Sequence, residues 1–591
     1  MQRFRRKGAR AVAAVTIVLP ILLVGWICVT GPIIPHNDYW MYLRNIVGDD
    51  GASPSLAGWT TLHNNHVLTG AYAVYAANLL LTRGSNHGLT VFSWLCAIAV
   101  LGILATWTRR ARSGDDGATR WFVAAQSWAL FSPFLAMFWV VGFSGVHTLG
   151  SVLLSLVAIE LWLQFRISAT GSRLVGCGLV VALSLTFFSS SLALVPVLGL
   201  ASLTELRRRD RRMLPFLAVL GLMGVLYLWI AGTSPQFPAR LPVAGVASLL
   251  LFPFAVLGSP FTKLVEPALA AGLLVTGALV WMAVRHLRHG RGELSHQRLA
   301  WWMLAGYGGV NALMMAATRS GDGLGAAFAT RYSVFPVLFC IAVAVLIAAE
   351  LPGAAGRWAG FWLLCATALA SHLNGASYLR ALEYRADLEP AARISLEAGV
   401  LDKQAIRGSI TPWIFSFTRM IPALKTHGWV PFHHAAIADR RIEAVGEFPP
   451  NSKLKILGRI DLGASSYRLV GAAPGSLPVG ARLRIVDPSS RVTVGRAVVT
   501  PGIRRRNDPD ARWWIGYLRV EDERRLVVVD EAGRVLGVTR CCAADRPLAP
   551  ALNPYQSPYA LWSGAGEFLS GSLQRRLEPN RTTPPEGDDP A

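Results

Sequence analysis

Apolar runs long enough to cross a membrane constrain this chain more than any other feature of its sequence. An α-helix needs about 20 predominantly apolar residues to span the hydrocarbon core of a bilayer. Eleven runs of this kind precede residue 375, near 11–31, 89–107, 122–141, 147–165, 174–188, 190–204, 214–232, 267–284, 300–317, 333–350 and 358–374. We therefore expect a mainly α fold, a multi-pass transmembrane helical bundle of about 11 spans.

The composition excludes a purely soluble protein. Of the 591 residues, 53% are hydrophobic and only 16% are charged, whereas soluble domains carry about 25% charged residues. The net charge of +22 might indicate a nucleic-acid partner, but the basic clusters stand between apolar runs, as the positive-inside rule describes. We predict no nucleic-acid partner, and we expect membrane lipids to surround the bundle.

The basic clusters also predict the orientation of the bundle. They lie at the N-terminus and at 109–112, 207–212 and 285–298, and eleven crossings place all of them in the cytoplasm. The predicted location is a bacterial inner (plasma) membrane, with a cytoplasmic N-terminus and an outer C-terminal domain. If two further apolar stretches, 67–82 and 243–258, also crossed the membrane, basic loops would lie on the outer face. We therefore expect interfacial helices there.

The character of the sequence changes near residue 375, so we divide the chain there. Residues 1–375 form the predicted transmembrane domain, 376–445 a mixed helical connector on the outer face, and 446–575 a small β-sandwich-like domain of short strands separated by Gly, Pro and Asp. Residues 576–591 read as a disordered tail. Adjacent Cys541 and Cys542 can form a vicinal disulfide or stay two separate thiols.

The segment after the first helix carries most of the chemistry. Residues 32–66 hold Asp38, Asp49, Asp50 and three histidines, with tryptophans between them. Ionisable groups beside a bilayer are costly and usually have a function. A sugar site combines such groups with aromatic faces, although Trp and Tyr also gather at any membrane interface. The segment alone fits both a sugar-binding site and an ordinary belt of interfacial aromatic residues.

At these residues the sequence resembles bacterial GT-C glycosyltransferases. The likeness rests on the acidic loop after the first helix, on TLHNNHVLTGAYAVYAANLL (61–80), and on ATRYSVFPVL (329–338). Members of that family often read Asn-Glu-His in the first of these two segments, where this chain has Asn65 in the middle. The resemblance covers about residues 10–430. It implies a catalytic first outer loop within 32–88, a polyprenyl-phosphate-linked sugar donor, and a glycan or lipid acceptor of the cell envelope.

The resemblance also implies roles for particular residues in an inverting hexosyl or pentosyl transfer. Asp38 matches the general base, with Asp49 or Asp50 as the alternative. Candidate cations for the leaving phosphate are Lys263, Arg319 and Arg331, although a snorkelling arginine explains Arg331 equally simply. The other expected substrate contacts, which include possible surface histidines, are His36, Tyr39, Trp40, His63, Asn64, His66 and Tyr332.

A metal is not assigned. Asp49 and Asp50 with His63 and His66 have suitable ligand types for a divalent cation, but the loop has no Asp-x-Asp triplet, so that cofactor stays open. Two other functions also stay open. One is a transporter or flippase of envelope precursors, and the other is a non-catalytic membrane assembly protein whose β domain binds partners.

Overall fold

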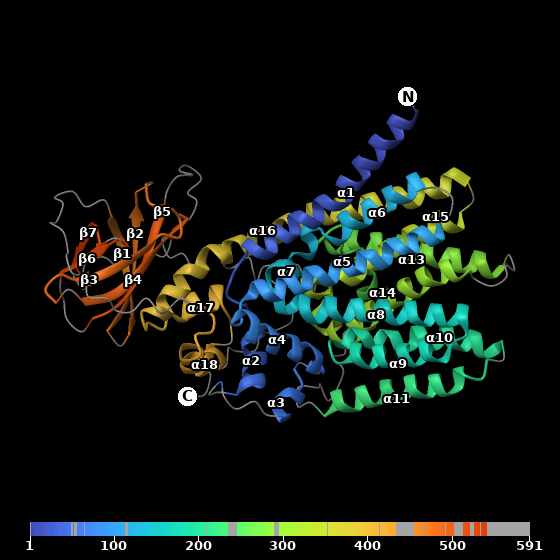
Figure 1. The fold of residues 1–591 in the computed structure, drawn as a ribbon, viewed down its shortest axis with the longest axis horizontal. Coiled ribbons are helices and arrows are strands. Elements are labelled where there is room, and N and C mark those ends of the chain that lie inside the picture. The colour runs from blue at the N-terminus through green and yellow to red at the C-terminus, as the bar shows by residue number, and fades with distance from the viewer. Residues whose placement is uncertain are drawn as a thin grey trace.

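The computed structural model is mainly helical, with a sheet domain near the C-terminus (Figure 1). It describes residues 2–48, 51, 56–63, 66–112, 116–208, 210–233, 245–288, 295–351, 353–412, 414–432, 454–463, 465–474, 476–490, 492–501, 512–520, 525–531 and 533–540. Asp49, Asp50, Asn64, Cys541, Cys542 and the predicted tail lie outside these residues. The sequence-based expectations for them stay predictions.

Long helices make up the first two thirds of the molecule. The α-helices are α1 (Gln2–Thr30), α2 (Tyr39–Val47), α3 (Leu56–Thr60), α4 (Thr69–Thr82), α5 (Asn86–Ala111), α6 (Asp116–Leu130), α7 (Ala136–Val140), α8 (Gly142–Ser168), α9 (Gly171–Leu185), α10 (Leu194–Arg207), α11 (Met213–Gly232), α12 (Val246–Gly258), α13 (Val265–Arg288), α14 (His296–Arg319), α15 (Val334–Glu350), α16 (Gly353–Glu397), α17 (Lys403–Ser409) and α18 (Ile414–Thr426). Short 3-10 turns are η1 (Pro133–Leu135), η2 (Ser189–Ala193), η3 (Ser320–Asp322), η4 (Leu324–Phe328) and η5 (Thr330–Tyr332).

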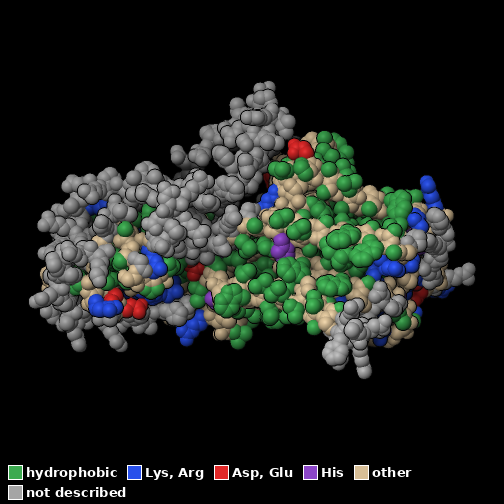
Figure 2. Space-filling view, turned by 90° about the horizontal axis from the view of Figure 1, so that it is seen from above, with side chains coloured by type: hydrophobic (Ala, Val, Ile, Leu, Met, Phe, Trp, Pro, Cys, Tyr) green, Lys and Arg blue, Asp and Glu red, His purple; other side chains and the backbone are tan. Residues whose placement is uncertain are grey.

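Among the described residues, eight helical segments are long and apolar enough to cross a membrane. They are Gly8–Thr30, Asn86–Ala111, Gly117–Val140, Gly142–Ser168, Ser189–Arg207, Met213–Gly232, Val265–Arg288 and Thr330–Glu350. The other three predicted runs lie within α9, α14 and α16, so the count of about 11 spans stays a prediction. Figure 2 shows hydrophobic side chains over most of one face of the bundle. A multi-pass membrane protein is therefore the class of this chain.

The two stretches expected at the interface are short helices, α4 and α12. Helix α12 packs tightly along α13. The approach requires glycine, because a Cβ on Gly258 or Gly272 would run into the backbone of the opposite helix at Ala268 or Phe254. Small residues at such crossings let helix backbones approach closely in lipid. These helices pair as a hairpin beside α14 and α15.

The segment 187–191 belongs to the turn between α9 and α10, and its serines lie inside the bundle. Ser190 and Ser191 in η2 are buried. Their hydroxyls lie 2.8 and 2.7 Å from the hydroxyl of Ser151 on α8. Small hydroxyl side chains can satisfy one another in an apolar interior, so this turn folds into the bundle.

Helix α16 crosses the predicted domain boundary at 375 without a break. It begins beside α15, passes α6 and ends against the sheet (Figure 1). Gly375 allows this path, because a Cβ there would meet the backbone of Pro133 and Phe134 in η1. The helical bundle and the sheet are thus joined by one long helix, and the connector begins as its continuation.

The C-terminal strands form one antiparallel sheet, in the order β1-β2-β5-β4-β3-β6-β7. The strands are β1 (Lys455–Gly463), β2 (Ser466–Ala473), β3 (Arg482–Asp487), β4 (Val492–Pro501), β5 (Arg512–Arg519), β6 (Arg525–Val529) and β7 (Val535–Arg540). Alternate residues face opposite sides: Ile515 packs towards α16, and its neighbour Trp514 packs into the core on the other face. The sequence predicted the strands and turns correctly. Hydrogen-bonded pairing runs through all the described strands in one sheet, and a sandwich of two sheets stays a prediction.

Candidate functional site

The candidate site begins where α1 ends. Pro32 and Pro35 stop the helix, and Asn37 adopts a left-handed backbone with φ of 54°, a conformation that asparagine tolerates better than most residues. This turn places Asp38 at the N-cap of α2. The carboxylate is therefore carried by the residue that caps a packed helix, at the end of the bundle that lies nearer the sheet (Figure 1).

Asp38 and His63 form the polar centre of the site. The Nε2 atom of His63 lies 3.5 Å from Oδ2 of Asp38, with side chains 7% and 22% exposed, respectively. The backbone of His63 is fixed by a two-way hydrogen-bonded bridge with His66. The backbone of the histidine is thus held in place beside the carboxylate.

Aromatic rings form the wall beside this pair. The ring of Tyr42 meets the ring of His63 edge-on at 4.6 Å and stacks on Tyr75 at 5.7 Å. The hydroxyl of Tyr75 donates to the carbonyl of Phe143 and lies 3.3 Å from Nδ1 of His147. Burial, and then the negative charge of Asp38, raises the pKa of Tyr42 well above its ordinary value. Tyr42 is therefore a neutral wall residue.

Arg331 supplies the positive charge of the site. It lies in η5, which packs against α7 and α8, and its guanidinium carbon stands 5.1 Å from the ring centre of Tyr332. Its Nε atom is buried without a hydrogen-bond partner. An arginine with a buried unused donor is a candidate for binding an anionic group.

His66 shows how close these charges lie. Burial lowers its pKa to about 3, and the nearby side chains of His147, His63, Arg331 and Arg319 act in the same direction. Its ring lies on Phe188 at 4.6 Å, and its Nδ1 has no hydrogen-bond partner. His66 is thus a neutral imidazole whose free nitrogen can accept or donate a hydrogen bond.

Three residues expected to touch the sugar are in the core instead. His36, Tyr39 and Trp40 are only 2%, 0% and 1% exposed. Trp40 donates from Nε1 to the carbonyl of Pro35 and packs edge-on against Phe417 of α18. The resemblance made them substrate contacts, because they stand beside Asp38 in the first outer loop. In the structure, Tyr39 and Trp40 begin α2 with both side chains buried, and His36 is buried in the turn before it. They support the site from behind.

The other two predicted cations, Arg319 and Lys263, have different surroundings. Arg319 ends α14 and pairs with Asp322 at 3.6 Å, and its charge reaches His66. Lys263 lies in the turn before α13, where burial lowers its pKa to about 8. Arg331 and Arg319 thus both act on His66.

Whether the site binds a divalent cation depends on residues outside the described part of the chain. Within the part of the chain that the structure describes, no three His, Cys, Asp or Glu side chains gather as a metal site. Asp49 and Asp50, the carboxylates that would complete a site with His63 and His66, are not in that part. A divalent cation stays neither assigned nor excluded.

Sequence reasoning missed His147 and Phe188. The ring of His147 lies 4.7 Å from that of Phe188, and Phe188 also carries His66. His147 stands inside an apolar run, where a lone histidine gives little signal. The signal that was available is its position near the outer end of a predicted span, where ionisable residues are often functional.

Together these residues make a polar cluster at one end of the bundle. A carboxylate, three imidazoles and an arginine are combined with a tyrosine wall. This set can accept a proton from a hydroxyl, bind an anion and exclude water. No family model matches the chain, and no curated protein is significantly similar to it.

Proposed function

We propose that this protein is an integral-membrane glycosyltransferase that uses a polyprenyl-phosphate-linked sugar. The observation that carries the proposal is the pairing of Asp38 with His63, beside the buried unpaired Nε of Arg331. A lipid-linked sugar needs a site with both functions, because an acceptor hydroxyl must lose a proton while a phosphate leaves with negative charge. The acceptor is a glycan or lipid of the cell envelope.

In the proposed mechanism, Asp38 is the general base. Its carboxylate takes the proton of the acceptor hydroxyl as the hydroxyl oxygen attacks the anomeric carbon, and the bond from that carbon to the phosphate oxygen breaks. Attack and departure on opposite faces invert the configuration. Proton transfer of this kind typically contributes about 10²–10⁴-fold to the rate. His63 holds the carboxylate, while Arg331 and Arg319 stabilise the leaving phosphate.

The proposed orientation follows from the two ends of the bundle. Arg109 and Arg110 end α5, Arg207 ends α10, and Arg285 and Arg288 end α13, all away from the Asp38 end. The positive-inside rule puts that basic end in the cytoplasm. With α9, α14 and α16 as the remaining crossings, the site and the sheet both lie outside the membrane of the proposed bacterial cell. Nucleotide sugars are absent there, which favours a lipid-linked donor.

The test is a glycan profile of the envelope from a deletion strain. The strain is complemented with wild type, with Asp38→Asn, or with Asp210→Asn as a matched carboxylate change at the basic end, at equal membrane levels. We expect wild type and Asp210→Asn to restore the missing sugar and Asp38→Asn to fail. Restoration by Asp38→Asn contradicts its role as the base, and an unchanged glycan in the deletion strain contradicts the whole proposal.

A second candidate is the transport of an envelope precursor. The observation that favours it is the buried hydroxyl cluster inside the bundle, in which Ser155 of α8 donates to the hydroxyl of Tyr307 on α14 and lies 3.3 Å from Ser184. Polar groups within a membrane often mark a pathway. In the same deletion strain, a transporter would leave its complete precursor to accumulate on the inner side, whereas loss of a transferase leaves the acceptor unglycosylated.

A further inference from the structure

The backbone on both sides of the Asp38 turn is fastened to the segment that joins the bundle to the sheet. Upstream, the N–H groups of Ile33 and Ile34 both donate to Oε1 of Glu389 on α16, at 3.2 Å each. At the residue before Asp38, the N–H of Asn37 donates to the carbonyl of Ile410 at 2.8 Å. The position of the proposed base is thus set by residues more than 350 positions later in the chain.

A second bond holds the same turn. The hydroxyl of Thr411 donates to the carbonyl of Asn37 at 3.0 Å. Both backbone groups of Asn37 are therefore bound to Ile410 and Thr411, and this residue carries the strained positive φ. A left-handed residue persists when its surroundings over-determine it.

Ile410 and Thr411 directly follow α17, and α17 is anchored in the sheet. Its N-cap residue, Asp402, accepts from the N–H groups of Gln404 and Ala405 through Oδ1. Its other oxygen, Oδ2, accepts from Nη1 of Arg468 on β2 at 2.8 Å and from the hydroxyl of Tyr517 on β5 at 3.0 Å. The side chains of Asp402 and Arg468 are both 0% exposed.

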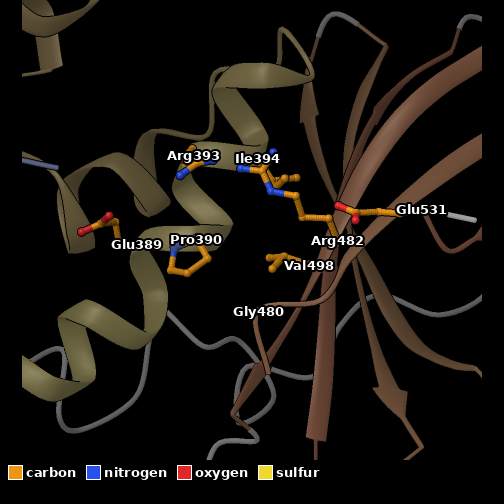
Figure 3. Close-up of a pocket in the computed structure, with 8 residues that line it drawn as sticks. All are labelled: Glu389, Pro390, Arg393, Ile394, Gly480, Arg482, Val498 and Glu531. Atoms are coloured by element: carbon orange, nitrogen blue, oxygen red, sulfur yellow. The ribbon is translucent and has the colours of Figure 1, made fainter. Parts of the chain in front are cut away.

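The anchor is reinforced on either side. Nη2 of Arg468 donates to Oε1 of Gln404 at 2.8 Å. The guanidinium therefore binds both the N-cap residue Asp402 and a side chain in the first turn of α17. Further along α16, Glu397 is bound by Arg393 of its own helix at 3.0 Å and by Arg482 of β3 at 3.5 Å. Figure 3 shows Arg482 reaching from the sheet towards α16 across a pocket of about 520 Å³.

We infer that the sheet positions Asp38, through the Asp402–Arg468–Tyr517 cluster, α17 and the two bonds to Asn37. The sheet is then a positioning part of the catalytic centre, in addition to any binding of glycan. This inference rests on the proposed function for the role of Asp38, but the mechanical link can be measured without it. Catalytic groups act efficiently only when the surrounding structure holds them within a fraction of an ångström.

The experiment is hydrogen exchange on the full chain in lipid nanodiscs, read in peptides that cover residues 33–43. Thr411→Val removes the bond next to the turn, and Tyr517→Phe removes one bond of the anchor in the sheet. Loss of one hydrogen bond should speed exchange in this segment about three- to tenfold in either variant. The matched control is Thr418→Val, whose exposed hydroxyl on α18 bonds only the nearby carbonyl of Phe415 in the described contacts and should leave the segment unchanged.

Unchanged exchange in both variants overturns the inference. A rise in Thr411→Val alone also overturns it, because the sheet then transmits nothing. If Tyr517→Phe loosens the whole sheet, Gln404→Leu tests the anchor from the helix side. Where transfer is measurable, both variants should lower kcat about tenfold with the donor KM unchanged. If wild type shows no transfer while exchange responds as expected, the proposed function fails and the positional link stands.

Discussion

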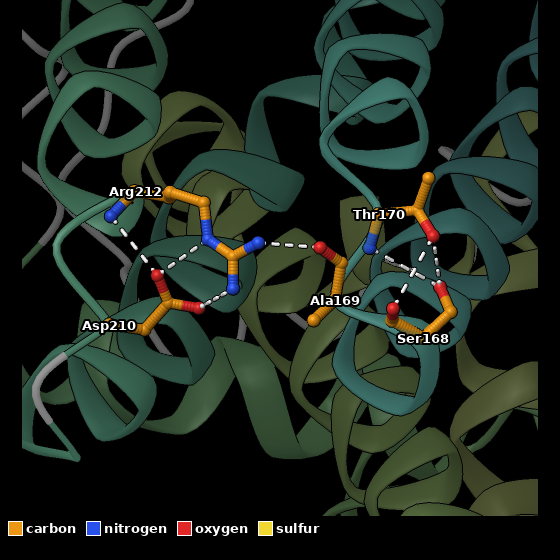
Figure 4. A network of polar contacts seen from close by, with 5 residues as sticks. All are labelled: Ser168, Ala169, Thr170, Asp210 and Arg212. Carbon is orange, nitrogen blue, oxygen red and sulfur yellow. Dashed lines mark hydrogen bonds and ion pairs between the residues drawn. The ribbon is translucent and has the colours of Figure 1, made fainter.

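The two ends of the helical bundle use the same charged residue types in different ways. At the basic end, Arg212 binds both oxygens of Asp210 at 2.9 and 2.8 Å and donates to the carbonyl of Ala169, which ties two loops together (Figure 4). At the other end, Asp38 pairs with His63 at 3.5 Å, and the Nε of Arg331 is buried without a hydrogen-bond partner. A charge bound by several donors fastens a loop, whereas a buried donor without a partner is available to a ligand.

The same contrast holds for more deeply placed charges. Glu205 of α10 is bound by Arg166 of α8 and by Arg208, each at 2.9 Å, and Glu160 is bound by Arg110, Trp107 and Gln164. These carboxylates have their oxygens satisfied by neighbouring helices. We expect substitutions at the basic end to lower stability and substitutions at the Asp38 end to lower activity.

Apart from changes to Asp38 itself, the largest effect should come from Arg331→Ala. If its guanidinium stabilises the leaving phosphate, the substitution should lower kcat/KM for the lipid-linked donor about 10²–10³-fold, as loss of a preorganised donor does in other enzymes. Arg331→Lys should recover part of this loss, because it keeps the charge but not the fork of donors. A stopped assay of polyprenyl phosphate release measures both, and equal activity of all three proteins would contradict this role of Arg331.

A smaller effect, on stability, is expected for Arg166→Met at the basic end. The pair with Glu205 is largely buried, with side chains 11% and 12% exposed. Removing one partner leaves the carboxylate poorly compensated and should destabilise the fold by about 1–3 kcal/mol. The thermal midpoint in nanodiscs should fall, while the activity per folded molecule stays at the wild-type value. Glu205→Met in the same protein should restore part of the stability, since an apolar pair can replace a buried ion pair.

The sequence predicts the helices of the bundle better than it predicts the residues that meet at the Asp38 end. Lipid forces each spanning segment to be an apolar helix, so hydropathy located every long helix of the bundle, and loop charge separated its two ends. The loop carrying Asp38, His63 and His66 stood out because polar residues cluster there in sequence. His147 and Phe188 did not stand out, since they belong to apolar runs and join the site only through packing.

The link between the sheet and the Asp38 turn was also beyond sequence reasoning. It ends on backbone groups of Asn37 and Ile410, which any residue supplies, and its side chains, such as Asp402 and Arg468, are far apart in the sequence, so composition and spacing do not indicate it. The inward turn of Ser190 and Ser191 was missed for a related reason. Serine reads as a surface residue until its partner hydroxyl on another helix is known.

Glu389 provides a pH test at the Asp38 end. Burial raises its pKa from 4.5 to about 8, against the opposing effect of the two N–H donors. A raised folded pKa contributes stability that is full below pH 4.5 and is lost as the pH rises through 8. Glu389→Gln is neutral throughout, so its thermal midpoint should exceed that of wild type by a margin that grows between pH 5 and 8.5. Parallel midpoints across this range would contradict a protonated Glu389.

The smallest effect is expected for Arg212→Gln. The pair with Asp210 is exposed to solvent, with side chains 50% and 25% exposed, and exposed ion pairs contribute little to stability. The thermal midpoint should change by less than about 2 °C, and activity should not change. A large loss of stability would show that the Arg212–Asp210 pair contributes more to the stability of the fold than its exposure indicates.

The most direct test of the proposed catalytic centre is donor binding and turnover by purified Asp38→Asn in nanodiscs, with wild type alongside. The account predicts an unchanged Kd for the polyprenyl-phosphate-linked sugar and an unchanged thermal midpoint. It also predicts transfer slower by about 10²–10⁴-fold, because only proton removal is lost. Wild-type turnover by Asp38→Asn, or a loss of activity that follows a loss of folding, would contradict the assignment of Asp38 as the base.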